Sequence, residues 1–348
     1  MDSFTQIALG ATIGEAGWRK SLGGRAPIWG GLCGLLPDLD VAMTAFDPWA
    51  DLVYHRSFTH SLLVLPFAAI PIGWLGHRFG KRRGTWWQWV HLSFWALITH
   101  PILDLFTFFG TQLLYPLSDR RFAIDGVSIV DLFYSLPLLA VCLLALKKGP
   151  PPRWRRRMAG WVLAFTTAYL LVGHFTMRVV RAEALAELRG EGFEPDDIRA
   201  LPTFLNDQAY RIVARRGEGE FRLSYRSYAA GAGTDWLTVR TVDDPRVERI
   251  WDTGRGQIFQ WFSDGLVVVR PREGESDVFE LIDLRFGGVT FPVGKLFAAS
   301  ATFDGEGPPT VERMPQAIPT DAGAELDALL DVIRSGDSEA WPSDANAP

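Results

Sequence analysis

The chain has 348 residues, of which 48% are hydrophobic and 22% are charged, and its formal net charge is −5. The apolar residues are concentrated in the first half, so the composition indicates a helical membrane domain followed by a polar domain. Basic residues gather beside the apolar runs and form no patch in the polar half, which argues against nucleic-acid binding.

Six membrane-embedded segments are expected within residues 1–180. The first two, at residues 7–18 and 26–46, are Gly-rich and interrupted by Glu15, Asp38 and Asp40, so they are full spans, half-spans or a re-entrant pair. Three later runs contain no Asp, Glu, Lys or Arg and have the length of about 20 residues that spans a bilayer, namely 57–76, 84–103 and 158–177. Residues 132–146 form a shorter run. The alternative is the buried helical core of a large soluble protein.

Charge placement predicts the orientation of a multi-pass protein, because Lys and Arg collect in cytoplasmic loops. Basic stretches at residues 77–84 and 147–157 are therefore expected in the cytoplasm. Alternation then puts the N-terminus, residues 47–56, residues 110–128 and everything after about residue 179 outside it.

The second half has the pattern of strands. Period-two alternation and Gly or Asp punctuation predict an antiparallel sheet or small sandwich from the runs at 209–216, 220–228, 235–242, 256–271 and 277–286. Residues 305–348 are rich in Pro, Ala, Asp and Glu and predict a tail with one short helix at 324–335 before a disordered end. The expected fold class is α+β, with a helical membrane domain at 1–180, a strand-rich extramembrane domain at 181–304 and the tail at 305–348.

Three motifs put ionisable side chains in or beside the apolar runs, where each costs about 2.5–3.5 kcal/mol and therefore needs a partner or a function. His100 and Asp104 are spaced i, i+4 and share one helical face, where they can bind one cation or two neighbouring ones. His55 and His60 would be separated by about 140° on a continuous helix. We therefore expect His55 in the incoming loop and His60 in the first turn, where both converge on a metal. Asp38 and Asp40 follow a proline that indicates a helix end or break.

The orientation drawn from the basic loops sends all three motifs to the outer end of their segments. This convergence predicts a metal site made of His and Asp side chains. A purely structural polar network, a cation transporter and a structural metal staple beneath a sensing outer domain are the alternatives. A structural zinc is saturated by four protein ligands, whereas a catalytic zinc keeps an open position.

The motifs MDSFTQIALGATIGEA, LLPDLD, HRSFTHSLL, THPILDLFTFFGTQLLYPLSDRRF and IVDLFYSLPLL together resemble the LexA-regulated, inner-membrane metal-dependent hydrolase family of bacteria and archaea. The resemblance covers roughly residues 1–180. It implies a hydrolase in the inner membrane that binds a divalent metal, namely one or more ions of zinc. The implied ligands are Asp38, His55, His60, His100 and Asp104. Asp40 is either a further ligand or a residue that contacts the ligands. Many relatives carry a His where this chain has Gln6. The His-x-x-x-Asp step is also distantly similar to zinc-dependent phospholipase C and related nucleases, which implies phosphoester hydrolysis.

In such a reaction Asp40 or Asp104 is expected to act as general base or bridging ligand, and Arg56 to hold an anionic phosphate or leaving group. Interfacial snorkelling is the alternative for Arg56. A site at the outer membrane edge predicts a lipid or lipid-linked phosphoester as substrate, with membrane lipid as the partner. The sequence leaves open the oligomeric state and whether other polar residues join the site, namely Gln6, Glu15, Asp125 and Asp131.

Overall fold

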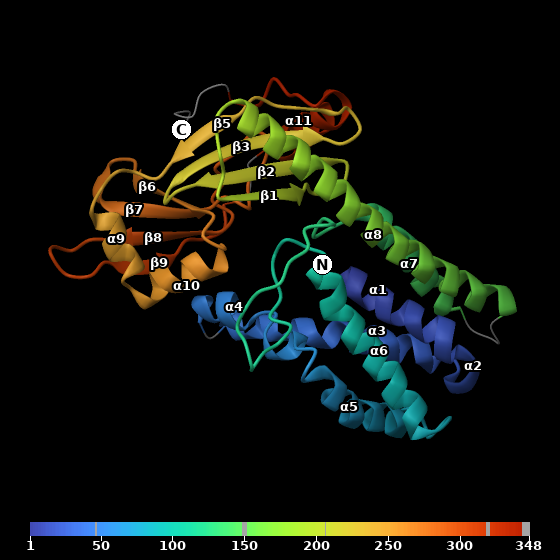
Figure 1. Ribbon diagram of the computed structural model, residues 1–348. Helices are drawn as coiled ribbons and strands as arrows, with labels where there is room; N and C mark the ends of the chain where they lie inside the picture. Colours follow the sequence, from blue (N-terminus) through green and yellow to red (C-terminus); the bar gives the residue numbers. More distant parts are fainter. Residues whose placement is uncertain (46, 148–151, 206, 318–320, 343–348) are drawn as a thin grey trace. The chain divides into compact units, whose positions relative to one another are not determined.

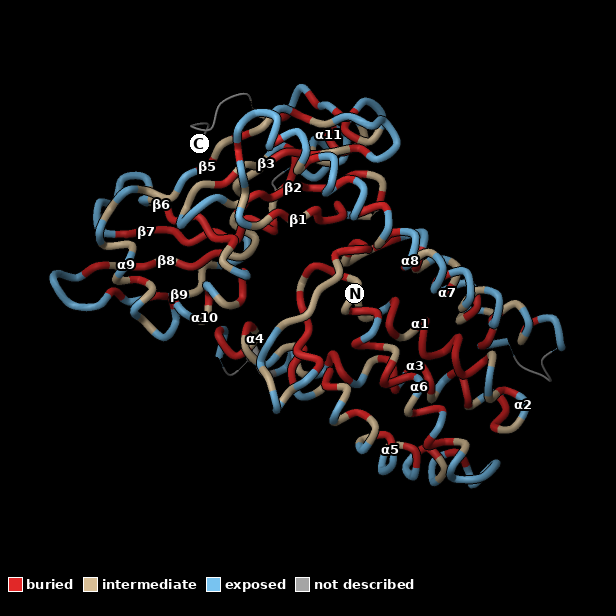
Figure 2. The backbone as a smooth tube through the Cα atoms, viewed as in Figure 1, coloured by how far each residue is buried: buried red, intermediate tan, exposed pale blue. Residues whose placement is uncertain are grey.

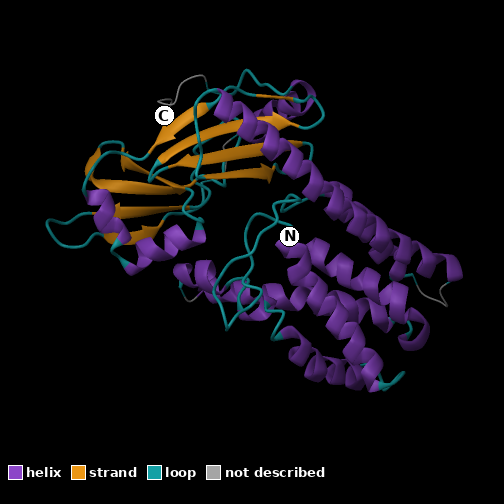
Figure 3. Ribbon diagram, viewed as in Figure 1, coloured by secondary structure: helices purple, strands orange, loops and turns teal. Residues whose placement is uncertain are grey.

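The computed structural model describes residues 1–45, 47–147, 152–205, 207–317 and 321–342 (Figure 1). The chain divides into two compact units. One comprises Met1–Phe175 and Phe204–Asp207, and the other comprises Thr176–Thr203 and Gln208–Pro348. Helices make up the first unit, and all the strands that the structure describes belong to the second (Figure 3).

The described residues of the first unit form eight α-helices, the last of which continues into the second unit, and three short segments of π or 3₁₀ helix. In chain order they are α1 Ser3–Ile13, the π-helical η1 Gly14–Trp18, α2 Arg19–Leu22, α3 Arg25–Leu35, the 3₁₀ segment η2 Leu36–Ala45, α4 Pro48–Tyr54, the 3₁₀ turn η3 Phe58–His60, α5 Leu65–Phe79, α6 Trp86–Leu105, α7 Leu132–Ala145 and α8 Arg153–Gly190.

Glycines bring α1 and α3 into close contact. A Cβ atom on Gly10 would lie 2.1 Å from the Gly30 carbonyl oxygen, and one on Gly34 would lie 2.4 Å from the Gln6 carbonyl oxygen. Small residues on both helices therefore allow backbone-to-backbone packing, as in membrane helix pairs. The consequence is that the first turns of α1 lie beside the end of α3, where the segment carrying Asp38 begins.

The expectation of six membrane segments is not supported. Of the described helices, α8 alone is long and apolar enough to cross a membrane, and a second span exists only if Pro48–His60 and Leu65–Phe79, bent by 72°, count as one broken span. The runs at 84–103 and 158–177 lie in the continuous helices α6 and α8, but the other four segments form shorter helices: α1 and α3 have 11 residues each, α7 has 14 and α5 has 15. These lengths fall below the roughly 20 residues of a full span. The orientation stays a prediction, and residues 148–151 of its second basic stretch lie outside the described residues.

The second unit confirms the predicted antiparallel, strand-rich architecture. One sheet has the order β1-β2-β3-β4, with β5 pairing with β3, and the other has the order β6-β7-β8-β9, with every pairing antiparallel. The strands are β1 Asp197–Pro202, β2 Ala209–Arg216, β3 Glu220–Ser227, β4 Ala232–Gly233, β5 Leu237–Arg240, β6 Val267–Arg272, β7 Glu275–Asp283, β8 Ala298–Thr302 and β9 Thr310–Arg313. Figure 2 shows β2 and β7 buried along most of their length, whereas many of the loops are exposed.

Helices in the second unit are α9 Arg246–Trp251, α10 Gly254–Phe262 and α11 Ala322–Ser335. The helix predicted at 324–335 is thus confirmed, and the expected disordered end at 343–348 lies outside the described residues. The run at 256–271 was predicted as one strand, but its first half is α10. The Thr253 hydroxyl caps that helix by accepting a hydrogen bond from the Gly256 N–H at 3.0 Å, and the strand begins only at Val267.

Candidate metal centre

Four side chains from three separate segments converge in the first unit. Asp38 lies in η2, directly after α3, and His60 ends the 3₁₀ turn η3. His100 and Asp104 lie one turn apart on α6. Each offers one ligand atom, and these four atoms all lie within 4.8 Å of one another. The predicted pairing of His100 with Asp104 on one helical face is confirmed.

Four of the six distances between these atoms are close to the edge length of a tetrahedron around a metal ion. His100 Nε2 lies 3.2 Å from Asp38 Oδ1 and 3.5 Å from Asp104 Oδ2. His60 Nε2 lies 3.2 Å from Asp104 Oδ2 and 3.8 Å from Asp38 Oδ1. A tetrahedral zinc ion with bonds of about 2.0–2.1 Å separates its ligand atoms by about 3.4 Å. The four distances are therefore compatible with one bound ion.

Burial makes a bound cation favourable for these atoms. His60, His100 and Asp104 are fully buried, and Asp38 is 8% exposed. Nε2 of His60, Nε2 of His100 and Oδ2 of Asp104 have no hydrogen-bond partner. A buried polar atom left in this state costs about 1–3 kcal/mol. A divalent ion at the centre of the four atoms satisfies all three at once, so the residues fit a metal.

A second layer of contacts orients the ligands. His100 Nδ1 donates to the Gly34 carbonyl oxygen at 2.7 Å, which leaves the Nε2 lone pair for the centre. The Ser3 hydroxyl donates to Asp38 Oδ2 at 2.6 Å, and Gln6 Nε2 donates to Asp104 Oδ1 at 3.1 Å. Asp104 Oδ1 also lies 2.5 Å from the Met1 amino group. Gln6 thus supports a ligand through its amide nitrogen, whereas nothing in the sequence distinguished Ser3.

His55 and Asp40 lie beside the four-ligand group rather than in it. His55 Nδ1 is 2.7 Å from Asp40 Oδ1, and Asp40 Oδ2 accepts hydrogen bonds from the Thr59 hydroxyl and the Arg56 N–H. His60 Nδ1 lies 3.4 Å from the same Oδ2. The expectation that His55 and His60 both bind one metal is therefore met by His60 only. His60 points at the centre, whereas His55 is paired with Asp40.

Arg56 reaches the centre from a strained backbone. Its φ of 61° lies in the left-handed region, which is unusual for a non-glycine residue. Nε of Arg56 lies 3.3 Å from Asp104 Oδ2, and its NH1 donates to the Thr107 hydroxyl at 3.0 Å. The guanidinium also lies over the Phe109 ring, 4.7 Å from the ring centroid. Arg56 is 4% exposed. Its side chain therefore lies in a buried ion contact with Asp104 and does not extend to the membrane interface, as the snorkelling alternative would require.

The residues left open by the sequence have other partners. Glu15 is fully buried on η1, where its carboxylate lies 2.9 Å from Arg155 Nε and 3.2 Å from Arg19 NH1. Asp131 caps α7 by accepting a hydrogen bond from the Tyr134 N–H at 2.9 Å. Asp125 is 6% exposed and, like Glu15 and Asp131, lies outside the four-ligand group.

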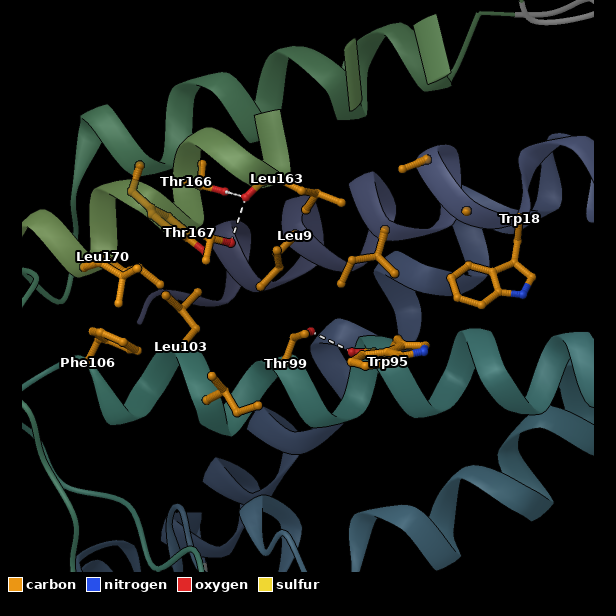
Figure 4. Close-up of a pocket in the computed structure, with 16 residues that line it drawn as sticks. Leu9, Trp18, Trp95, Thr99, Leu103, Phe106, Leu163, Thr166, Thr167 and Leu170 are labelled. Atoms are coloured by element: carbon orange, nitrogen blue, oxygen red, sulfur yellow. Dashed lines mark hydrogen bonds between the residues drawn. The ribbon is translucent and has the colours of Figure 1, made fainter. Parts of the chain in front are cut away.

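A separate apolar cavity of about 540 Å³ is lined by residues of α1, η1, α6, α7 and α8. Figure 4 shows Leu9 and Trp18 together with Trp95 and Leu103 from α6 and Leu170 from α8. The four candidate ligands do not line it. The cavity and the metal centre are thus distinct features of the first unit.

Residues 1–180 match the family of the YdjM inner membrane protein. The uncharacterized protein YfhP of Bacillus subtilis (strain 168) is 23% identical over 191 residues, which are 52% of this chain and 54% of that protein. The chain thus spans about half the length of this relative. No solved structure matches the chain. Since the family match covers more than half of its 348 residues, the chain belongs to the YdjM inner membrane protein family. This agrees with the predicted LexA-regulated membrane family and with the inner membrane as its location, whereas the hydrolase activity and the similarity to phospholipase C stay predictions.

Proposed function

We propose that the chain is a metal-dependent hydrolase of the inner membrane that cleaves a phosphoester bond in a lipid or lipid-linked substrate. The observation that carries the proposal is the convergence of three unpartnered buried atoms, on His60, His100 and Asp104, with the carboxylate of Asp38. A bound divalent ion such as zinc lowers the pKa of a coordinated water and polarises a phosphoryl oxygen.

Arg56 provides a second group for an anionic substrate. Its Nε has no hydrogen-bond partner, although it lies 3.3 Å from Asp104 Oδ2. A guanidinium binds phosphate oxygens through two parallel hydrogen bonds, and contact with Phe109 holds this one in a fixed plane. Arg56 is therefore suited to bind a phosphate beside the metal. Asp38 is more exposed than the other three ligands, so the substrate is expected to approach from its side.

Exposed apolar side chains on the ligand-bearing segments support a lipid substrate. Leu39, between Asp38 and Asp40, is 55% exposed, and Phe58, two residues before His60, is 56% exposed. Apolar side chains that flank a polar centre favour a ligand that is apolar over part of its length. A lipid-linked phosphoester has this character.

A structural metal staple is the second candidate, and the number of ligands favours it. Four protein ligands saturate a tetrahedral zinc ion, whereas a catalytic zinc keeps or gains a position for water. Catalysis here requires a fifth position or exchange of one carboxylate. The cation-transporter alternative is weaker. A transporter needs polar groups that lead a cation away from the centre, and the carboxylate of Glu15 is already paired with Arg19 and Arg155.

Hydrolysis of phospholipids and polyprenyl phosphates in detergent, with and without a chelator, tests the proposal. Wild type, His100→Ala and Arg56→Lys are compared with His91→Ala, which changes an exposed histidine on the same helix. We expect chelator-sensitive release of phosphate-bearing products by wild type and His91→Ala only. Release of fatty acids, or activity that survives both the chelator and His100→Ala, contradicts the proposal. Loss of stability on chelation without any hydrolysis supports the staple.

A further inference from the structure

The carboxylate of Asp40 is held by three donors, although it is not one of the four metal-binding groups. Its Oδ2 accepts hydrogen bonds from the Thr59 hydroxyl at 2.5 Å and from the Arg56 N–H at 3.1 Å. Its Oδ1 lies 2.7 Å from Nδ1 of His55. A carboxylate oxygen only accepts, so the facing nitrogen carries the proton. In its neutral form the His55 ring therefore carries its lone pair on Nε2.

His55 differs from the two histidines at the centre. The His100 ring also donates from Nδ1, but its Nε2 faces Asp38 and Asp104 inside the ligand group. The hydrogen bond that His55 makes with the described residues runs from Nδ1 to Asp40, and Nε2 makes none with them. The His55 side chain is 17% exposed, whereas His60 and His100 are at 0%. Its ring lies edge-on to His60 with 5.9 Å between centroids. The His55 ring therefore lies next to the four-ligand group and is partly exposed.

From this geometry we propose that His55 transfers the proton during hydrolysis and that Asp40 is its positioning residue. Neither residue is then a metal ligand. The inference rests on the proposed phosphoester hydrolysis and names the residues that manage its proton. The arrangement of carboxylate, Nδ1–H and free Nε2 is the one in which a histidine acts as a general base, because the carboxylate fixes the tautomer and the ring orientation.

The proposed step is balanced in atoms and charge. The oxygen of a water molecule forms a bond to phosphorus while the ester P–O bond breaks. One proton of that water moves to Nε2 of His55 and later leaves to solvent. The oxygen of the leaving group takes a proton from solvent. His55 returns to the neutral ring that Asp40 holds.

The experiment compares four full-length variants in detergent, each supplied with zinc: His55→Ala, Asp40→Asn, His100→Ala and the control His91→Ala. Bound zinc and phosphoester hydrolysis are measured for each. We expect His55→Ala to keep the zinc content of wild type, whereas His100→Ala loses it. Hydrolysis by His55→Ala is expected to fall by about 10²–10⁴-fold and to be restored in part by added imidazole. Nitrogen NMR of histidine-labelled wild type should show His55 protonated on Nδ1, and Asp40→Asn should lose this preference.

Each outcome decides the inference. Loss of zinc from His55→Ala to the level of His100→Ala overturns it, because His55 is then a ligand. Undiminished hydrolysis by His55→Ala, a loss that imidazole does not restore, or a wild-type His55 ring without a proton on Nδ1 also overturns it. A wild type that binds zinc and hydrolyses no phosphoester rejects the proposed function itself. That result is distinguishable from failure of the His55 inference, because it is seen in the wild type alone, without any variant.

Discussion

Replacing His100 by alanine should release the metal while leaving the fold of α6 intact. Four-ligand zinc sites in small domains contribute about 10–16 kcal/mol of apparent binding free energy, so one ligand is worth on the order of 3 kcal/mol. That loss corresponds to about a hundredfold weaker binding. The His100 ring is oriented by the Gly34 carbonyl oxygen and is fully buried, so a solvent water does not easily take its place.

The weaker zinc binding of His100→Ala also predicts how much less zinc stabilises this variant against unfolding. At a zinc concentration 100 times the wild-type Kd, binding stabilises the folded protein by about 2.7 kcal/mol. A hundredfold weaker variant at that concentration gains only about 0.4 kcal/mol. Thermal unfolding in detergent with and without zinc measures both gains, and His91→Ala should behave as wild type. Equal zinc stabilisation of His100→Ala and wild type would refute the metal centre.

Three further predictions concern the surroundings of the centre. Gln6→Ala removes a donor to Asp104, and we expect metal affinity in a chelator competition to fall by about 10–100-fold. Glu15→Ala leaves the buried Arg155 and Arg19 without their carboxylate, so the free energy of unfolding should fall by about 3–5 kcal/mol at unchanged zinc stoichiometry. A cysteine introduced at Lys81 should be protected from an impermeant thiol reagent in intact cells, and its labelling would contradict the predicted orientation.

The part of the metal centre that lies on a helix could be predicted from the sequence, because helical periodicity determines which side chains share a face. His100 and Asp104 share a face because both lie in α6, which continues through Pro101. Asp38 and Asp40 lie two residues apart in the 3₁₀ segment η2, so their side chains point about 120° away from each other. No residue pattern distinguishes this from a turn. Thus Asp38 faces the metal centre, while Asp40 faces His55.

The fold was harder to predict where one run of residues changes conformation. Residues 57–76 read as an uninterrupted apolar span, but η3 and a turn occupy its first part and α5 begins only at Leu65. The hydrogen bond from the Leu62 N–H to the Leu113 carbonyl oxygen, 2.9 Å long, fixes this turn through a contact distant in sequence. Such tertiary contacts override a local hydropathy pattern. They also place His60 in the centre.

The strained backbone of Arg56 leads to a prediction that separates conformation from side-chain function. The left-handed region costs a non-glycine residue about 1–2 kcal/mol, and glycine avoids this cost. Arg56→Gly and Arg56→Ala both remove the guanidinium beside Asp104, so they differ mainly in backbone preference. Glycine loses about 0.4–1 kcal/mol more conformational entropy on folding, which leaves a net difference of about 1 kcal/mol in its favour.

Chemical or thermal unfolding of the two zinc-loaded variants measures this difference directly. Arg56→Gly should be the more stable of the two, and both should lose phosphoester hydrolysis. An alanine variant as stable as the glycine variant would mean that the φ of 61° stores no strain. If instead glycine is favoured over alanine, the chain keeps an arginine in a backbone conformation that favours glycine. The reason for that choice is then the contact of its guanidinium with Asp104 and the phosphate proposed to bind there.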